Sequence, residues 1–122
     1  MEQTQHTLRQ PFRDCIAACN DCAQICNLCS DDMIGMKHHT ELMELCIRLC
    51  RECADICLLS AHWMSRRSPL SEQICRFCAE ICDACAETCE QHQSHHALCG
   101  VCAKECRRCA ELCREMAGAK RS

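Results

Sequence analysis

Apolar positions recur along the chain at a helical spacing, and cysteine occupies most of them. Within each of four blocks, neighbouring cysteines alternate strictly between gaps of three and four residues. The spacing averages about 3.5 residues, which is the period of a helix side that faces a partner helix. Each block is therefore predicted to be a helix whose buried side carries thiols. Block by block, the cysteines are Cys15, Cys19, Cys22, Cys26 and Cys29; Cys46, Cys50, Cys53 and Cys57; Cys75, Cys78, Cys82, Cys85 and Cys89; and Cys99, Cys102, Cys106, Cys109 and Cys113.

Proline, glycine and serine mark the ends of the predicted helices. Pro11 suits a first helical turn, Gly35 interrupts the helical pattern, and Ser68 can cap a helix that has Pro69 in its first turn. The predicted helices span about residues 11–32, 38–64, 69–91 and 95–117. Short connections make successive helices antiparallel neighbours. The predicted fold class is therefore all-α: a single domain formed by an up-down-up-down four-helix bundle with a cysteine-lined core.

Small and large apolar residues flank the cysteines in different ways. Alanine follows six of them and lets helices approach closely: Ala23, Ala54, Ala79, Ala86, Ala103 and Ala110. A larger apolar residue, such as Leu28, Phe77 or Val101, precedes many others. Part of this outer row is expected to contact another subunit, which predicts a homo-oligomer.

Composition narrows the functional classes. A formal net charge of −3 does not favour a nucleic-acid partner, and no run approaches the roughly 18 apolar residues of a membrane span. Residues 1–14 lack the apolar stretch of a secretory signal, so we expect a cytosolic protein. Cytosolic thiols stay reduced. Helical neighbours, with Cβ atoms about 5–6 Å apart, are also too distant for a disulfide. Disulfides between helices stay open as an alternative.

Nineteen buried thiols in helical register favour a soft monovalent metal ion. Zinc would form at most four tetrathiolate sites and would leave about eight negative charges in a dry core. One Cu(I) per thiolate leaves the core neutral, and thiolate is a ligand that Cu(I) prefers. We therefore predict that the chain binds multiple Cu(I) ions.

The chain resembles the bacterial copper storage proteins, specifically their short cytosolic form. The resemblance extends from about Phe12 to Met116 and depends on the four cysteine helices and on segments such as 50–57 and 81–85. It implies a four-helix bundle that binds many Cu(I) ions through cysteine thiolates, and it implies a homotetramer.

The two ends of the predicted bundle differ in chemistry. At one end, thioethers and imidazoles continue the cysteine rows, with His38 and His96 beside them. We predict that copper enters and leaves here, through Met33, Met36, His39, Met43, His92 and His95. The opposing interpretation is that these methionines fill the core and these histidines are solvated. The other end continues the rows into an apolar plug of Phe12, Met64, Ser71 and Met116.

The predicted function is storage and sequestration of Cu(I) in the cytosol. No nucleophile with its base and orienting group stands out, so no enzymatic activity is expected. Two alternatives stay open: a thiol redox buffer that scavenges oxidants, and a buffer for zinc or cadmium. Metal stoichiometry separates them, because zinc binds at most about one ion per four cysteines.

Overall fold

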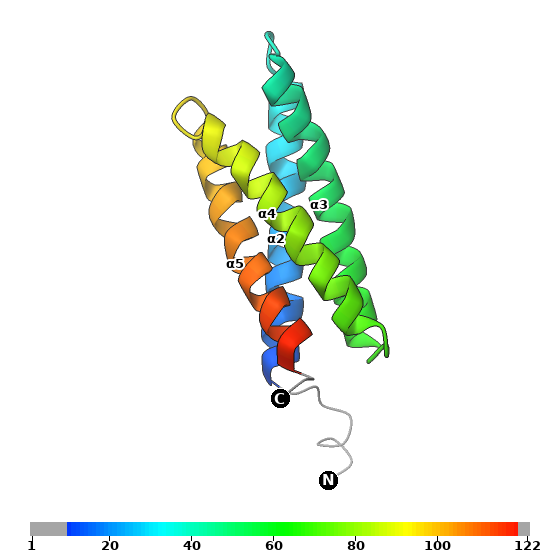
Figure 1. Ribbon diagram of the computed structural model, residues 1–122. Helices are drawn as coiled ribbons and strands as arrows, with labels where there is room; N and C mark the ends of the chain where they lie inside the picture. Colours follow the sequence, from blue (N-terminus) through cyan, green and yellow to red (C-terminus); the bar gives the residue numbers. More distant parts are fainter. Residues whose placement is uncertain (1–9, 120–122) are drawn as a thin grey trace.

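The computed structural model describes residues 10–119, which form four α-helices. These are α2 (Gln10–Ile34), α3 (Glu41–Ser65), α4 (Ser71–His92) and α5 (Ala97–Ala119). They run alternately up and down (Figure 1), and each helix packs against two others, α2 and α4 both lying between α3 and α5. The all-α four-helix bundle predicted from the cysteine spacing is confirmed.

The helix ends lie within three residues of their predicted positions. Helix α3 begins after Thr40, whose Oγ1 accepts a hydrogen bond from the backbone N–H of Met43 at 3.0 Å. The prediction that Ser68 caps the third helix is wrong. Its hydroxyl accepts a hydrogen bond from the N–H of Leu70 at 3.0 Å, and its carbonyl accepts one from Ser71 at 3.1 Å. Ser68 therefore closes a turn, and α4 begins at Ser71.

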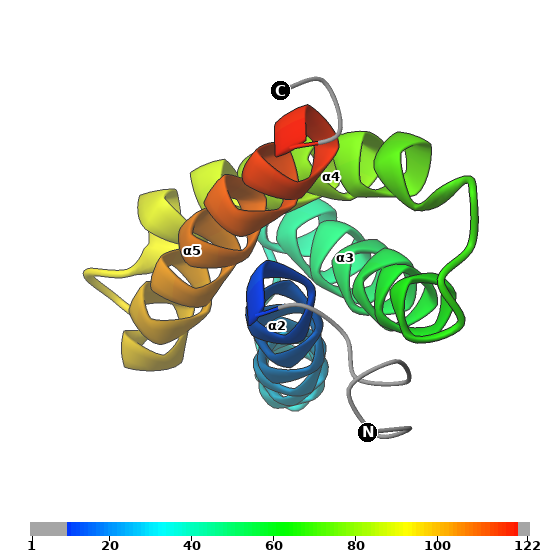
Figure 2. The same cartoon turned by 90° about the horizontal axis from the view of Figure 1, so that it is seen from below.

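Two connections lie together at one end of the bundle. Residues 35–40 and 93–96 form what we call the loop end (Figure 1). The turn over residues 66–70 lies at the opposite end, together with the first residues of α2 and the last of α5, and we call this the terminal end. Seen from the terminal end, the four helices surround a common core (Figure 2). The loop end thus lies at one end of that core.

The core consists mainly of thiols and alanine methyl groups, with a few methionines. All nineteen cysteines are 0 % exposed, and the six alanines that follow cysteines are at most 3 % exposed. These alanines are buried in the core beside the cysteines. Larger apolar side chains such as Leu28, Phe77 and Val101 are about half exposed on the outer surface. The protein therefore buries little aliphatic or aromatic area in its centre.

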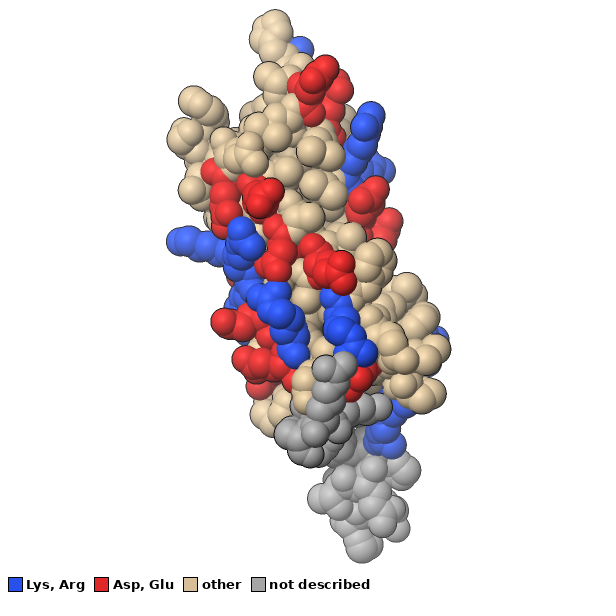
Figure 3. Space-filling model, viewed as in Figure 1, with Lys and Arg blue, Asp and Glu red and all other residues tan. Residues whose placement is uncertain are grey.

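Charged side chains cover much of the outer surface (Figure 3). Arg107 on α5 donates hydrogen bonds to Asp83 at 3.0 Å and to Glu90 at 2.9 and 3.1 Å, both on α4. Arg114 donates to the second oxygen of Asp83 at 2.6 Å. This network joins α4 to α5 outside the core. Within residues 10–119, no helix is long and apolar enough to cross a membrane.

Candidate metal centre

The sulfur atoms of the core form a continuous lattice along the bundle. Neighbouring Sγ atoms are separated by distances that range from 3.5 Å between Cys46 and Cys89 to 4.0 Å between Cys50 and Cys102. These separations are far longer than the roughly 2.05 Å of a disulfide bond. All nineteen cysteines are free thiols. The lattice is therefore a continuous row of available soft ligands.

Sulfur contacts cross the bundle as well as following each helix. Cys57 on α3 lies 3.7 Å from Cys78 on α4 and 3.8 Å from Cys109 on α5. Cys22 on α2 lies 3.7 Å from Cys106 on α5 and 3.9 Å from Cys53 on α3. Because the small cysteine side chain leaves the axis open, sulfurs of helices that do not pack directly still reach each other. One ion can thus take ligands from three or four helices.

Groups of four sulfurs close enough to share one ion overlap one another. Five such groups, each with all Sγ atoms within 4.8 Å of one another, are Cys19, Cys78, Cys109, Cys113; Cys22, Cys26, Cys53, Cys106; Cys22, Cys53, Cys57, Cys82; Cys26, Cys85, Cys102, Cys106; and Cys29, Cys50, Cys89, Cys102. Cys22 and Cys53 each belong to two of these groups. Separate tetrahedral sites cannot all be filled when they share ligands, so the arrangement favours thiolates that bridge several ions.

The sulfur spacing matches a bridged cluster without rearrangement of the helices. A metal–thiolate bond of about 2.3 Å places two trigonal sulfur ligands about 4.0 Å apart, and two tetrahedral ligands about 3.8 Å apart. The observed contacts of 3.5–4.0 Å fall close to these values. Sulfur pairs at these distances are therefore close enough to share one ion.

Neighbouring thiols change each other's acidity. Hydrogen bonding with Cys102 and Cys106, together with burial, raises the pKa of the Cys26 thiol well above its ordinary value. Hydrogen bonding with Cys113 and Cys19 instead lowers the pKa of the Cys109 thiol to about 7, despite burial. One protonated thiol thus stabilises a neighbouring thiolate, which allows the core to lose protons stepwise as metal arrives.

His96 connects the loop end directly to the core. Its Nδ1 lies 2.9 Å from the Sγ of Cys99, and its Nε2 lies 2.5 Å from Oδ2 of Asp32 on α2. The carboxylate accepts the Nε2 proton, so Nδ1 carries the lone pair that faces the thiol. From the sequence, His96 is predicted only to lie beside the residues through which copper enters and leaves. Its separation from Cys99 by three residues, one helical turn, was the signal that could have found it.

Two further histidines at this end have one ring nitrogen fixed by an oxygen atom. Nε2 of His39 donates to the carbonyl of Met33 at 2.9 Å, and Nδ1 of His92 donates to the carbonyl of Thr88 at 3.0 Å. The other nitrogen of His92 is buried and has no hydrogen-bond partner among residues 10–119. Each ring therefore directs a lone pair away from its oxygen partner, which is the arrangement of a metal-binding histidine.

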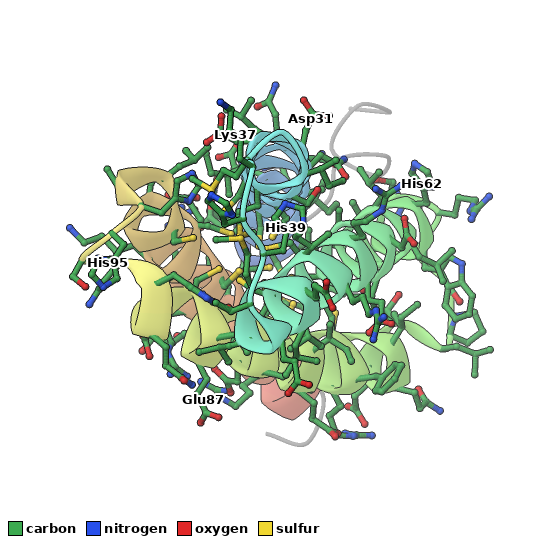
Figure 4. The ribbon with its side chains drawn as sticks, turned by 90° about the horizontal axis from the view of Figure 1, so that it is seen from above. Asp31, Lys37, His39, His62, Glu87 and His95 are labelled. Carbon is green, nitrogen blue, oxygen red and sulfur yellow. The ribbon has the colours of Figure 1, made fainter. Side chains whose placement is uncertain are left out.

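The other residues through which copper is predicted to enter are buried to different extents. Met33 is 1 % exposed, and its Sδ lies 4.0 Å from the Sγ of Cys99. Met43 on α3 is half-buried against the core. Met36, in the loop before α3, is also half-buried. Viewed from above, His39 lies over the sulfur core, whereas His95 lies at the outer edge of the α4–α5 loop (Figure 4). The structure thus brings His39, but not His95, over the sulfurs.

The terminal end is closed mainly by apolar side chains. Met64, Ser71 and Met116 are buried there, and Phe12 packs against the core. Met64 does more than fill space, since its Sδ accepts a hydrogen bond from the Cys75 thiol at 3.6 Å. Cys113 acts to lower the pKa of Cys75, but the combined effects of Cys15 and of burial are greater and raise it to about 12.

The fold and this centre together define a helical bundle with a thiol-lined, metal-binding core. The family profile for copper storage proteins matches residues 8–118. The chain therefore belongs to the copper storage protein family, and the resemblance drawn from its cysteine helices is confirmed.

Relatives with solved structures have the same bundle. The Cu(I)-bound copper storage protein BsCsp3, from Bacillus subtilis, is 44% identical, with a TM-score of 0.81 over 88% of this chain and 99% of that one. A cytosolic copper storage protein from Streptomyces lividans, solved with five coppers, is 33% identical, with a TM-score of 0.84 over 89% and 93%. An uncharacterised cysteine-rich B. subtilis protein, YhjQ, is 47% identical over 91 residues, or 73% of this chain and 82% of that one.

Proposed function

We propose that this copper storage protein holds Cu(I) in the cytosol on the thiolates of all nineteen core cysteines, with about one ion per cysteine. The observation that carries the proposal is the sharing of sulfurs between neighbouring groups of four. Shared thiolates bridge several ions, and bridging raises the capacity above that of separate four-sulfur sites. The Cu(I)-bound and five-copper relatives support the choice of metal, and the cytosolic description of the S. lividans protein supports the compartment.

Electrostatics favours copper over zinc in this core. Every thiolate is withdrawn from water, so uncompensated negative charge in the core is costly. One Cu(I) per thiolate cancels that charge in full, whereas one zinc ion per four thiolates leaves half of it. Soft thiolate ligands also favour Cu(I) chemically.

Titration of the fully reduced protein with Cu(I) under anaerobic conditions tests this function. A competing chelator reports the free ion, and the ions bound per chain are counted at the plateau. We expect a plateau near the cysteine count of nineteen. A plateau at four or fewer ions, or displacement of copper by zinc, would contradict Cu(I) storage. It would favour the divalent-metal or thiol-redox alternative instead.

We further propose that Cu(I) passes through the loop end. The doorway consists of Met33, Met36, His39, Met43, His92 and His95, and the contact between His96 and Cys99 adds a seventh ligand at its inner edge. Support comes from the lone pairs of His39, His92 and His96, each set free by an oxygen partner on the other nitrogen. Nitrogen and thioether ligands bind Cu(I) more weakly than thiolate, so they can pass the ion inward.

This geometry supports metal storage rather than catalysis. Cys99, His96 and Asp32 align like a nucleophile with its base and orienting carboxylate. However, the Cys99 sulfur is 0 % exposed, which gives a substrate carbon no route to it. A bare metal ion is small enough to reach this sulfur through the histidine ligands. We therefore propose a non-enzymatic role for the set.

The assembly that we propose is a homotetramer. Leu28 and Val101 line one hollow with Ile25, between α2 and α5. Leu59 and Phe77 line a second with Ile56 and Ile81, between α3 and α4. Leu28, Leu59, Phe77 and Val101 are between 41 % and 55 % exposed. Two apolar surfaces on different sides of one bundle suit a closed assembly with two kinds of interface.

A further inference from the structure

At the terminal end, the cysteine row on α3 continues into a serine and a methionine. On α3 the cysteine positions run through Cys46, Cys50, Cys53 and Cys57, and the next two positions in the same register hold Ser60 and Met64. Met64 is 0 % exposed, and its Sδ lies 3.6 Å from the Sγ of Cys75. That separation lies within the range of the cysteine–cysteine contacts in the lattice. The thioether therefore continues the row of sulfurs where α3 has no further cysteine.

Each of the four helices places one sulfur at the terminal end of the lattice. Cys15 lies on α2, Met64 on α3, Cys75 on α4 and Cys113 on α5, and all four residues are 0 % exposed. The Sγ atoms of Cys15 and Cys113 are 3.7 Å apart. Cys75 is the first cysteine of α4, so it lies at the same end of the core as Cys15, the first on α2, and Cys113, the last on α5. The four sulfurs thus form the last layer of the lattice before the apolar end.

A buried polar atom in the same row also lacks a partner. Ser60 is 0 % exposed, and its hydroxyl makes no hydrogen bond in the described part of the chain. It lies one helical turn from Met64, on the side of α3 that faces the core. A buried hydroxyl without a partner is unfavourable in a core of neutral thiols. It becomes a useful donor once nearby thiols are converted to metal-bound thiolates.

The chemistry of a thioether suits the last ion of a filled core. Methionine is a soft ligand for Cu(I), and it carries no charge. It therefore completes the coordination of an ion held by Cys15, Cys75 and Cys113 without disturbing the balance of one Cu(I) per thiolate. Phe12, Ser71, Glu72 and Met116 line the small cavity beyond Cys75.

We propose that the terminal end holds a mixed thiolate–thioether Cu(I) site, formed by Cys15, Cys75 and Cys113 with the Sδ of Met64. The site rests on the Cu(I) storage function proposed above and deepens it. It changes the role of this end from an apolar plug to a metal-binding cap.

X-ray absorption at the selenium edge tests the site. The protein is labelled with selenomethionine and loaded with Cu(I) to its plateau, and a selenium–copper component is measured. Met64→Leu is compared with Met116→Leu, because Met116 is also buried at this end and each variant keeps the same number of selenium atoms. We expect a larger selenium–copper component in Met116→Leu than in Met64→Leu, since only Met64→Leu removes a ligand of the proposed site. Any contribution from the loop-end methionines is common to both variants.

The outcomes separate the site from the storage function. Equal selenium–copper components in the two variants, with normal loading of the unsubstituted protein, would overturn the Met64 site and leave Cu(I) storage intact. A plateau of four or fewer ions in the unsubstituted protein would overturn storage itself, and the site with it. If Met64→Leu lost its helical circular dichroism, Met64→Ile would replace it in the comparison.

Discussion

At the scale of single residues, three histidines near the loop end each have one ring nitrogen held by an oxygen atom, which leaves the other nitrogen available to a metal ion. Asp32 holds Nε2 of His96, and backbone carbonyls hold one nitrogen each of His39 and His92. Such partners fix the tautomer and the direction of the ring, and a carboxylate also raises the basicity of the other nitrogen. His96 is therefore the strongest nitrogen ligand of the three.

Removing the carboxylate partner of His96 should lower the affinity of the protein for the first Cu(I) that it binds. Asp32→Asn keeps the size of the side chain but removes its negative charge, and losses of outer partners cost about tenfold or more in metal affinity. We expect about tenfold weaker binding and slower uptake of the first Cu(I) per chain, with unchanged total capacity. Anaerobic competition with a chelator at one ion per chain measures the affinity, and stopped-flow mixing measures the rate.

Asp31→Asn is the matched control, because Asp31 is the preceding residue on α2 and is exposed. It removes the same charge from the same end of the bundle without touching His96. Equal affinities and rates for the two variants would show that only the general charge of the loop end matters, and that His96 has no special role in uptake.

At the scale of the helices, alanine sets how closely the thiols of adjacent helices approach. Ala86 on α4 is 0 % exposed and follows Cys85, whose thiol donates to Cys50 on α3 at 3.5 Å. A larger side chain at this position would push the helices apart and lengthen the sulfur contacts. The distances in the lattice thus depend on residues that bind no metal.

A larger side chain at position 86 should lower the free energy of unfolding of the bundle and disturb the sulfur–sulfur contacts of the core. Ala86→Leu inserts three extra carbon atoms into a closely packed interface, which costs about 1–3 kcal/mol of free energy of unfolding. Ala84→Leu is the control, since Ala84 is exposed on the same helix and leucine is almost as good a helix former as alanine. Denaturant unfolding of the metal-free proteins measures both. A loss for Ala84→Leu as large as that for Ala86→Leu would contradict this account.

The helices and the bundle could be predicted from sequence because one residue type marks every buried position. The alternating gaps between cysteines indicate both that each segment is a helix and which side of that helix is buried against the neighbouring helices. Helix starts were less predictable: Ser68 and Pro69 resemble a cap and first turn, but the hydroxyl of Ser68 is used within a turn. Contacts between distant segments were not predictable, since nothing in a one-dimensional pattern aligns Asp32 with His96 or Met64 with Cys75.

At the scale of the whole molecule, loading with metal is an exchange of protons for copper. Hydrogen bonding with Cys109 raises the pKa of Cys57, and it does the same for Cys113, with burial adding to both shifts. Such thiols are protonated at neutral pH and must lose a proton when they bind Cu(I). At these positions one Cu(I) replaces one proton, so the charge of the core does not change there.

Proton release should accompany copper in a ratio of about one to one near pH 7. Below the pKa of the thiols, each proton released weakens binding about tenfold for every unit by which the pH falls, so affinity rises with pH. Titration in weak buffer with a pH indicator counts the protons released per Cu(I). Release close to zero would mean that the thiolates exist before the metal arrives, and would contradict a neutral empty core.

The cross-helix reach of the sulfur contacts has a consequence for the lifetime of the protein. An empty bundle has few large side chains in its centre and depends on small ones, whereas a loaded bundle is cross-linked through its cargo at every level. Bound metal stabilises the folded state and suppresses opening. Cellular proteases cleave mainly opened chains, so they would remove empty bundles first and spare full ones. The quantity of stored metal would then set how long each storage molecule survives.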